Sequence, residues 1–275
     1  MKLRVALVQF GRDRLDKSKN INRMLSILSE IRDVDIVCLP EAWTGGVRLF
    51  LEEGECKSLL SSLCHIASEN CYNLLTGGLF NCREGKIFDT CHVISRSGKV
   101  IGFYDKRFPS TAFNEREFVS PGRVSPVFKI NNINIGVLIC VDALYPELAR
   151  CMALRGAYII FNPSNIPKNR SELWKHVSVT RAAENTVFYV FANNTNTEYP
   201  DGRPVRGHSV VAAPDGEVML EAGEEEDVFR VELDLDQVEK IRRRWRYLDD
   251  IRQLQPYNSH FIGIEAEGGN RATCT

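Results

Sequence analysis

The chain has 275 residues, of which 44% are hydrophobic and 26% are charged, proportions typical of a globular protein that buries a sizeable core. Its 35 lysines and arginines nearly balance 36 aspartates and glutamates, so charge gives no reason to expect nucleic acid or a membrane surface as a partner. The N-terminus does not resemble a signal peptide, and no segment has the apolar length of a transmembrane helix. We therefore expect a cytoplasmic protein.

Strand and helix patterns alternate along the first half of the chain. An apolar β-rich run precedes an amphipathic helix, and the same order then repeats. Two turn signals follow, at 96–99 and at 131–132, and each joins two strands. The expected strands are 3–10, 34–41, 72–80, 90–95, 100–106, 127–130 and 133–140, and the expected helices are 20–31 and 59–67.

The second half continues the alternation. Helices are expected at 145–156, 171–185 and 236–245, strands at 157–164, 186–194 and 228–235, and a hairpin at 207–220 with Asp215 and Gly216 at its turn. No repeat or linker divides the chain. Strands with interleaved helices indicate an α/β layered sandwich. We expect one domain, residues 1–263, and a mobile polar tail, residues 264–275.

The nine cysteines indicate neither a zinc site nor a disulfide framework, because no pair has C-x-x-C spacing and their number is odd. Most should be reduced and buried. The five histidines are scattered and form no ligand cluster. The glycines of WTGG and TGGLF are interpreted as turn residues, since no phosphate-loop lysine follows them.

Three residues that could perform chemistry each stand at the end of an expected strand: Glu41, Lys106 and Cys140. In an open α/β sheet, ligands bind beyond the carboxyl ends of the strands. Taken singly, the two charged residues are typical solvated strand-end groups and the cysteine a typical core residue. Together they supply a base, an electrophile and a nucleophile, so we predict that they converge.

Three segments that contain these residues resemble the signature blocks of the nitrilase superfamily, the carbon–nitrogen hydrolases. They are LPEAWTGG, YDKRFPSTAFNEREFVSPG and GVLICVDALYPELAR, and further matches on both sides extend the resemblance, in order, over nearly the whole chain. The resemblance implies an α-β-β-α sandwich and a triad of Glu41, Lys106 and Cys140. It also implies a second glutamate shortly before the Pro-Gly of the middle block. Glu117 is the preferred candidate, and Glu115, two residues earlier, is less favoured.

The roles implied by this resemblance form a hydrolytic mechanism. Glu41 acts as general base and Cys140 as nucleophile, with a helix N-terminus after Cys140 expected to favour the thiolate. Lys106 and the backbone N–H of Val141 stabilise the oxyanion, and Glu117 orients Lys106 or the substrate. Ammonia or an amine leaves, and water releases the acid from a thioester on Cys140. No step needs a metal ion or an organic cofactor.

The function expected from these features is hydrolysis of a small amide to a carboxylic acid and ammonia. A nitrilase or an N-carbamoyl amide hydrolase is the alternative, but familiar nitrilases have Trp-Glu after the nucleophile, where this chain has Val141 and Asp142. The Cys-x-Asp pattern is more similar to the amidase and carbamoylase branches. A catalytically silent binding subunit is a further alternative, and the intact triad argues against it.

The substrate is the least determined feature. Several relatives that act on amides of acids with a free carboxylate have an arginine four residues after the cysteine, where this chain has Leu144. Leucine cannot clamp a carboxylate. We therefore expect a small neutral amide, unless Arg48, Arg107 or Arg170 enters the pocket from a loop.

A homodimer or higher homo-oligomer is expected from the resemblance alone. Family members associate through the helices that follow the nucleophile, which here are 145–156 and 171–185. Met152, Leu173 and Trp174 could form an apolar patch on this face, although packing in the core would explain them equally well.

Overall fold

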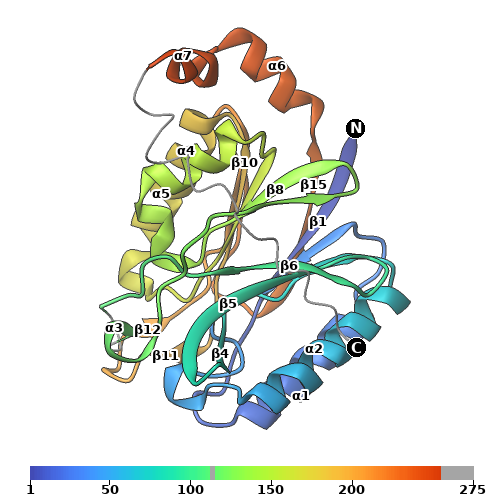
Figure 1. Cartoon of the computed structure of the whole chain (residues 1–275), viewed down its shortest axis with the longest axis vertical. Helices are drawn as coiled ribbons and strands as arrows, with labels where there is room; N and C mark the ends of the chain where they lie inside the picture. The colour runs from blue at the N-terminus through green and yellow to red at the C-terminus, as the bar shows by residue number, and fades with distance from the viewer. Residues whose placement is uncertain (112–114, 255–275) are drawn as a thin grey trace.

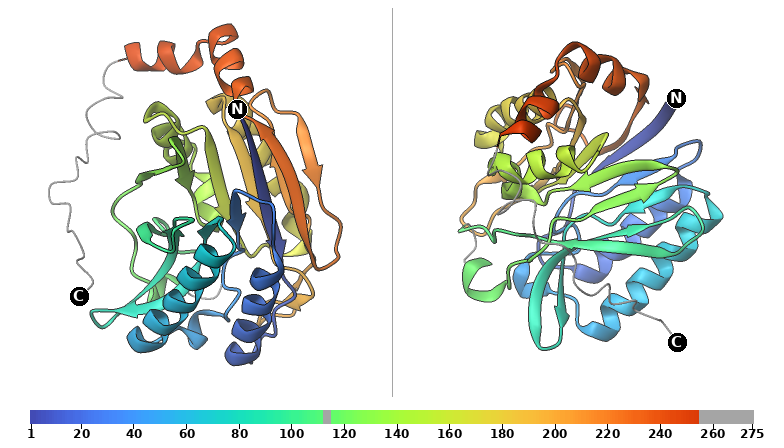
Figure 2. Two further views of the ribbon diagram at one scale, coloured as in Figure 1. Left: turned by 90° about the vertical axis from the view of Figure 1, so that its right-hand side faces the viewer. Right: turned by 45° about the horizontal axis from the view of Figure 1, so that its top comes forward.

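The structure, a computed structural model, describes residues 1–111 and 115–254. Two β-sheets pack face to face, and helices cover the outer face of each (Figures 1 and 2). This is the α-β-β-α sandwich that the resemblance implied. The predicted tail at 264–275 and the predicted domain end at 263 lie outside the described residues.

The first sheet has seven strands, in the order β15-β1-β2-β3-β5-β4, with β6 also paired to β5. Its two central pairings, β1 with β2 and β2 with β3, are parallel, whereas β15 lies antiparallel to β1 along the full length of both strands. The strands are β1 (Lys2–Gln9), β2 (Ile36–Cys38), β3 (Asn73–Leu75), β4 (Leu79–Arg83), β5 (Lys86–Ile94), β6 (Val100–Asp105) and β15 (Asp227–Asp234).

The second sheet has six strands, in the order β14-β13-β10-β9-β8-β7, and β8, β9 and β10 are parallel. The predicted turn at Asp215 and Gly216 joins β13 to β14. The strands are β7 (Val127–Ile130), β8 (Ile133–Val137), β9 (Ile159–Pro163), β10 (Phe188–Ala192), β13 (Val210–Ala212) and β14 (Val218–Glu221). A separate pair consists of β11 (Thr197–Glu198) and β12 (Pro204–Val205).

Two helices, α1 (Lys17–Glu30) and α2 (Glu53–Glu69), cover the first sheet. The Asp16 side chain caps α1 by accepting from the N–H of Lys19, and a reciprocal capping box of Glu52 and Glu55 starts α2. Each helix buries one stripe of residues three or four apart. The buried residues are Asn20, Met24 and Leu28 in α1, and Cys56, Leu59, Leu63 and Ala67 in α2.

Two further helices, α4 (Pro146–Leu154) and α5 (Ser171–Asn185), cover the second sheet. A Cβ on Gly136 of β8 would lie 2.5 Å from the sulfur of Met152, so this glycine allows α4 to approach the sheet. Met152 and Trp174 are buried in the core, and only Leu173 is exposed. Met152 and Trp174 therefore do not contribute to the apolar surface patch suggested for these three residues, and only Leu173 remains on the surface.

Alternate residues of β1 explain the continuous apolar runs of the sequence. Val5 and Leu7 contact the core between the two sheets, while Ala6 and Val8 contact the core beneath α1 and α2. A strand buried on both faces loses the polar alternation of a surface strand. The chain ends its described part with α6 (Asp236–Arg244) and α7 (Tyr247–Gln253).

Two predicted elements differ from the structure. The strand expected at 72–80 is divided into β3 and β4 by residues 76–78, and the helix expected from residue 145 is preceded by a 3-10 helix, η3 (Cys140–Leu144). Two other 3-10 turns, η1 (Val47–Leu49) and η4 (Lys168–Arg170), and the short helix α3 (Glu115–Phe118) were not predicted. Within residues 1–111 and 115–254, no helix could cross a membrane.

Candidate active site

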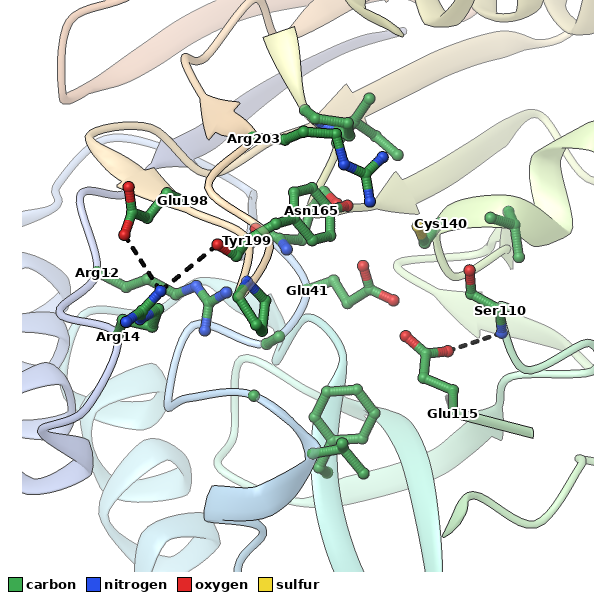
Figure 3. Close-up of a pocket in the computed structure, with 18 of the residues that line it drawn as sticks. Arg12, Arg14, Glu41, Ser110, Glu115, Cys140, Asn165, Glu198, Tyr199 and Arg203 are labelled. Atoms are coloured by element: carbon green, nitrogen blue, oxygen red, sulfur yellow. Dashed lines mark hydrogen bonds and ion pairs between the residues drawn. The ribbon is translucent and has the colours of Figure 1, made fainter. Parts of the chain in front are cut away.

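The structure brings Glu41, Lys106 and Cys140 to one edge of the sandwich. Glu41 follows β2 and Lys106 follows β6, both in the first sheet, whereas Cys140 follows β8 of the second sheet. The Lys106 Nζ donates to Oε1 of Glu41 at 2.6 Å. All three side chains are buried, and Figure 3 shows Glu41 and Cys140 in the wall of one pocket. The two sheets must dock correctly for these groups to meet.

A second glutamate holds Lys106, and it is Glu115. Oε2 of Glu115 accepts from Lys106 Nζ at 2.8 Å and from the backbone N–H of Ser110 at 2.8 Å. Glu117 is exposed on the other side of the same short helix. The preference for Glu117 over Glu115 is therefore wrong, because residues two positions apart on a helix do not share a face.

Asp89, a third carboxyl group, lies against the same ammonium. Its Oδ2 is 3.4 Å from Lys106 Nζ, and neither oxygen accepts a hydrogen bond from the residues that the structure describes. Burial raises the pKa of Asp89 well above its usual range, although Lys106 opposes this. Burial lowers the pKa of Lys106, but Glu115, Glu41 and other anions more than offset it. Burial therefore favours the protonated form of Asp89, while the surrounding carboxyl groups favour the charged form of Lys106.

Cys140 occupies a sharp turn between strand and helix. Its φ of 49° lies in the left-handed region, which costs a non-glycine residue energy and is often found at active sites. The side-chain amide of Asn162 donates to the carbonyls of Leu138 and Cys140 and holds this turn.

The Cys140 thiol is neutral at rest. Burial raises its pKa well above the usual range, the charge of Glu41 adds to this, and Lys106 opposes it. The helix N-terminus expected to favour a thiolate is absent at this position, because Cys140 opens the five-residue η3 and α4 begins only at Pro146. The thiol therefore needs a base during attack.

Asp142 links the Cys140 turn to the segment that follows Lys106. Its carboxylate accepts from the hydroxyl of Tyr104 at 2.7 Å and from the backbone N–H groups of Arg107 and Phe108, both at 2.9 Å. These bonds join the two sheets beside the site. Burial raises the pKa of Asp142 to about 6. From the sequence alone, Asp142 was used only as part of the Cys-x-Asp pattern that separates amidase-like from nitrilase-like relatives.

Two glycines allow Glu41 to approach its neighbours. A Cβ on Gly77, whose φ is +69°, would lie 1.9 Å from the carbonyl oxygen of Pro40. A Cβ on Gly78 would lie 2.9 Å from Cγ of Glu41 and 2.5 Å from Oδ1 of Asp89. The glycines interpreted as turn residues therefore also make room for the acidic cluster.

A cavity of about 900 Å³ opens in front of Cys140. Val141 and Leu144 line it, as do Arg48 and Arg170. Arg107 does not line it, and its Nη1 donates to the carbonyl of Arg123 at 2.6 Å. Three further arginines contribute to the wall, namely Arg12, Arg14 and Arg203.

Several residues of the site were not found from the sequence. Arg12, Asn165 and Asn194 follow β1, β9 and β10, so the strand-end argument applied to these strands would have found them. The amide of Asn194 donates to the carbonyl of Glu41 at 2.6 Å and to Oδ1 of Asn165 at 2.9 Å. Asp89 had a different signal, an acidic residue that directly precedes the expected strand at 90–95.

Among residues 1–111 and 115–254, no group of three or more His, Cys, Asp or Glu side chains is placed to hold a metal ion. The eight cysteines described are free thiols, and five of them, including Cys140, are buried. Cys274 lies outside the described residues.

Comparison with known proteins places this geometry in a family. The carbon-nitrogen hydrolase sequence profile matches residues 4–243. A hydrolase in the agr operon of Staphylococcus aureus is 34% identical over 220 residues, which cover 76% of this chain and 82% of that protein. The 2-oxoglutaramate amidase of Bacillus subtilis (strain 168) is 29% identical over 258 residues, which cover 92% of this chain and 99% of that protein.

A solved structure gives the same result for the fold. Saccharomyces cerevisiae Nit3, a member of branch 10 of the nitrilase superfamily, matches with a TM-score of 0.79 and 28% identity over 89% of this chain and 94% of that chain. The chain therefore belongs to the carbon-nitrogen hydrolase family. The resemblance to the nitrilase superfamily stated from three sequence segments is confirmed.

Proposed function

We propose that this protein hydrolyses a small amide to a carboxylic acid and ammonia through a thioester on Cys140. The observation that carries the proposal is the buried Lys106, hydrogen-bonded to Glu41 and Glu115 beside a buried thiol in the wall of one cavity. The Bacillus subtilis relative, named as a 2-oxoglutaramate amidase, supports an amide as substrate.

The first half of the reaction forms the thioester. Glu41 removes the proton from the neutral thiol as the sulfur of Cys140 attacks the amide carbon. The oxyanion that develops is stabilised by Lys106 and by the backbone N–H of Val141, and one such donor is typically worth about 3–4 kcal/mol of barrier. Glu41 then returns its proton to the nitrogen as the C–N bond breaks, and ammonia leaves.

The second half releases the acid. Glu41 removes a proton from water, the resulting hydroxide attacks the thioester carbon, and Lys106 and Val141 stabilise the second oxyanion. The C–S bond then breaks and the sulfur recovers a proton from Glu41. Glu115 keeps the Lys106 ammonium charged and oriented throughout, since it accepts one of its hydrogen bonds.

The experiment compares the wild type with Cys140→Ala, using ammonia release from a panel of small amides and intact-mass spectrometry with a reactive ester. We expect turnover and an acyl adduct in the wild type, and neither in the variant, with unchanged folding. Ammonia release by the folded variant would refute the role of Cys140. No adduct in the wild type would favour a silent binding subunit, and faster acid production from nitriles than from the matching amides would favour a nitrilase.

A further inference from the structure

Arg12 is a buried cation, and two of its three guanidinium nitrogens lack hydrogen-bond partners among the described residues. It lies in the loop after β1, is only 5% exposed, and its Nε and Nη1 bond to no atom of the described residues. A guanidinium presents five N–H donors in a fixed planar fork, and buried polar groups are normally satisfied. Such a group in the wall of a cavity is suited to binding an acceptor from outside the protein.

Arg12 remains charged in this environment. Burial lowers the pKa of Arg12 to about 10, whereas Tyr199 and Glu41 raise it and Arg14 lowers it. A pKa of about 10 still leaves the guanidinium protonated at neutral pH. The cavity therefore contains a positive charge that is poorly hydrated.

The acidic residues of the cavity are already paired with other cations. Glu41 and Glu115 accept from Lys106. Glu198 accepts from Arg14 at 3.1 Å. None of these three carboxylates forms a hydrogen bond or ion pair with Arg12 in the described structure, so the charge of Arg12 is left for a ligand.

The position of Arg12 relative to the nucleophile suggests how a substrate lies. In Figure 3, Arg12 and Cys140 are on opposite sides of Glu41, and the Arg12 side chain points toward Glu41. Both residues line the same cavity. A substrate whose amide carbon lies at Cys140 can therefore extend past Glu41 toward Arg12.

We propose that Arg12 binds a carboxylate at the far end of the substrate, so that the enzyme prefers amides of acids with a second carboxylate over neutral amides. This inference rests on the proposed amide hydrolysis at Cys140. A guanidinium fork matches the two oxygens of a carboxylate, and Leu144 offers no such group. In this proposal the loop after β1 supplies a cation that position 144 lacks. It replaces the expectation of a neutral substrate, which held only if no arginine entered the pocket from a loop, and Arg48 and Arg170 also line the cavity.

The test uses succinamate and butyramide, two four-carbon amides that differ in a terminal carboxylate. We expect wild-type kcat/KM to be at least about tenfold higher for succinamate, and Arg12→Met to lower this ratio about 100-fold, since a site built for a polar group is selective for it. Arg12→Lys, which keeps the charge but loses the fork, should give an intermediate ratio. Arg230→Met, the same change on exposed β15, should leave the ratio unchanged.

Thermal unfolding gives a second readout that does not need turnover. Arg12→Met should be at least as stable as the wild type, because an unpaired buried charge is costly. Succinate should raise the Tm of the wild type but not of Arg12→Met, and butyrate should raise neither.

The outcomes separate this inference from the proposed function. A wild type that prefers butyramide, or an Arg12→Met variant that retains both the succinamate preference and the succinate effect on Tm, would overturn the role of Arg12. Failure to hydrolyse either amide would count against amide hydrolysis, whereas a succinate effect lost in Arg12→Met would still support carboxylate binding.

Discussion

Lys106 shows how individual side chains determine the chemistry of this site. It is fully buried, Glu41 and Glu115 accept its hydrogen bonds, and Asp89 lies 3.4 Å away. A buried ammonium is tolerated only where anions and hydrogen bonds replace its lost hydration. Burial and the charges of Glu41 and Glu115 raise the pKa of the neighbouring thiol, and Lys106 lowers it, so the charge of the cluster influences when Cys140 can react.

Glu115 and Glu117 form a matched pair for testing this charge balance. Glu115→Gln removes the negative charge of a side chain that accepts a hydrogen bond from Lys106. Glu117→Gln removes the same charge from the exposed side of α3. We expect kcat/KM to fall about 100-fold or more for Glu115→Gln, since misplacing a catalytic group costs about this much, and to stay within about twofold for Glu117→Gln. Steady-state assays of both folded variants check this. Equal losses would contradict the assignment of Glu115.

Asp89 predicts a particular dependence of stability on pH. Its folded-state pKa is raised well above the usual value by burial, so the folded protein retains this proton where the unfolded chain releases it. The protonated Asp89 therefore contributes its full share to the free energy of unfolding at pH values below the pKa that Asp89 has in the unfolded chain, which is near 4. This contribution is lost as the pH rises toward the pKa that Asp89 has in the folded protein. Asp89→Asn cannot lose a proton. Relative to the wild type, the variant should gain more stability at pH 8 than at pH 4.

Urea unfolding at both pH values measures this gain. Asp35→Asn, which changes a half-buried carboxylate that accepts from the backbone N–H of Arg4, controls for removal of an acid elsewhere in the first sheet. A gain for Asp89→Asn that is larger at pH 4 would show that Asp89 is ionised in the folded protein.

At the scale of helices and strands, the sequence predicted the elements well and their junctions less well. Continuous apolar runs indicated β1, β2 and β8 because these strands are buried on both faces, and strand ends then led to Glu41, Lys106 and Cys140. The five-residue η3 was missed because its length carries no periodic signal. Glu115 was ranked below Glu117 because one short turn of helix, α3, decides which of the two nearby glutamates faces inward.

Long-range contacts explain the other omissions. Asp89 and Lys106 are 17 positions apart on neighbouring strands of a hairpin, and the pairing register of β5 and β6 determines that they meet. Arg12 and Glu41 are separated by α1, and only the parallel alignment of β1 and β2 brings their loops together. A single sequence does not reveal register, so it could supply the residue types of the site but not the complete set.

The glycines between β3 and β4 provide a test at this scale. Gly77→Ala places a Cβ 1.9 Å from the Pro40 carbonyl, whereas Gly85, with a φ of +72°, has nothing within 4 Å of its Cβ position. Gly85→Ala should lower the free energy of unfolding by only about 1 kcal/mol, because alanine adopts the left-handed conformation less readily than glycine. Gly77→Ala should cost about 3 kcal/mol or more and lower kcat/KM about 100-fold by displacing Glu41. Urea titrations and kinetics of both variants measure this, and equal costs would refute the steric argument.

At the scale of the whole molecule, we propose that two copies associate through the face made by α4 and α5. Met152 and Trp174 are buried within one chain, which leaves Leu173 on α5 and Leu144 on the adjacent η3, both 39% exposed. Light scattering should give about twice the chain mass of 31.2 kDa. Leu173→Glu should shift the protein toward monomer, while Val100→Glu on the distant strand β6 should not. A wild-type monomer at micromolar concentration would refute this proposal.

The pairing of β1 with β15 has a consequence for how the protein is made. β1 comprises residues 2–9 and its neighbour β15 comprises residues 227–234, so the ribosome completes the first strand long before it has synthesised the strand that covers its edge. At the usual 5–20 residues per second, this interval lasts roughly 10–45 s. During that time a nascent chain presents an apolar strand with one free edge, the kind of template on which chains aggregate. Chaperone demand should therefore be greatest during synthesis, and slowing translation after residue 9 should lower the yield of soluble protein.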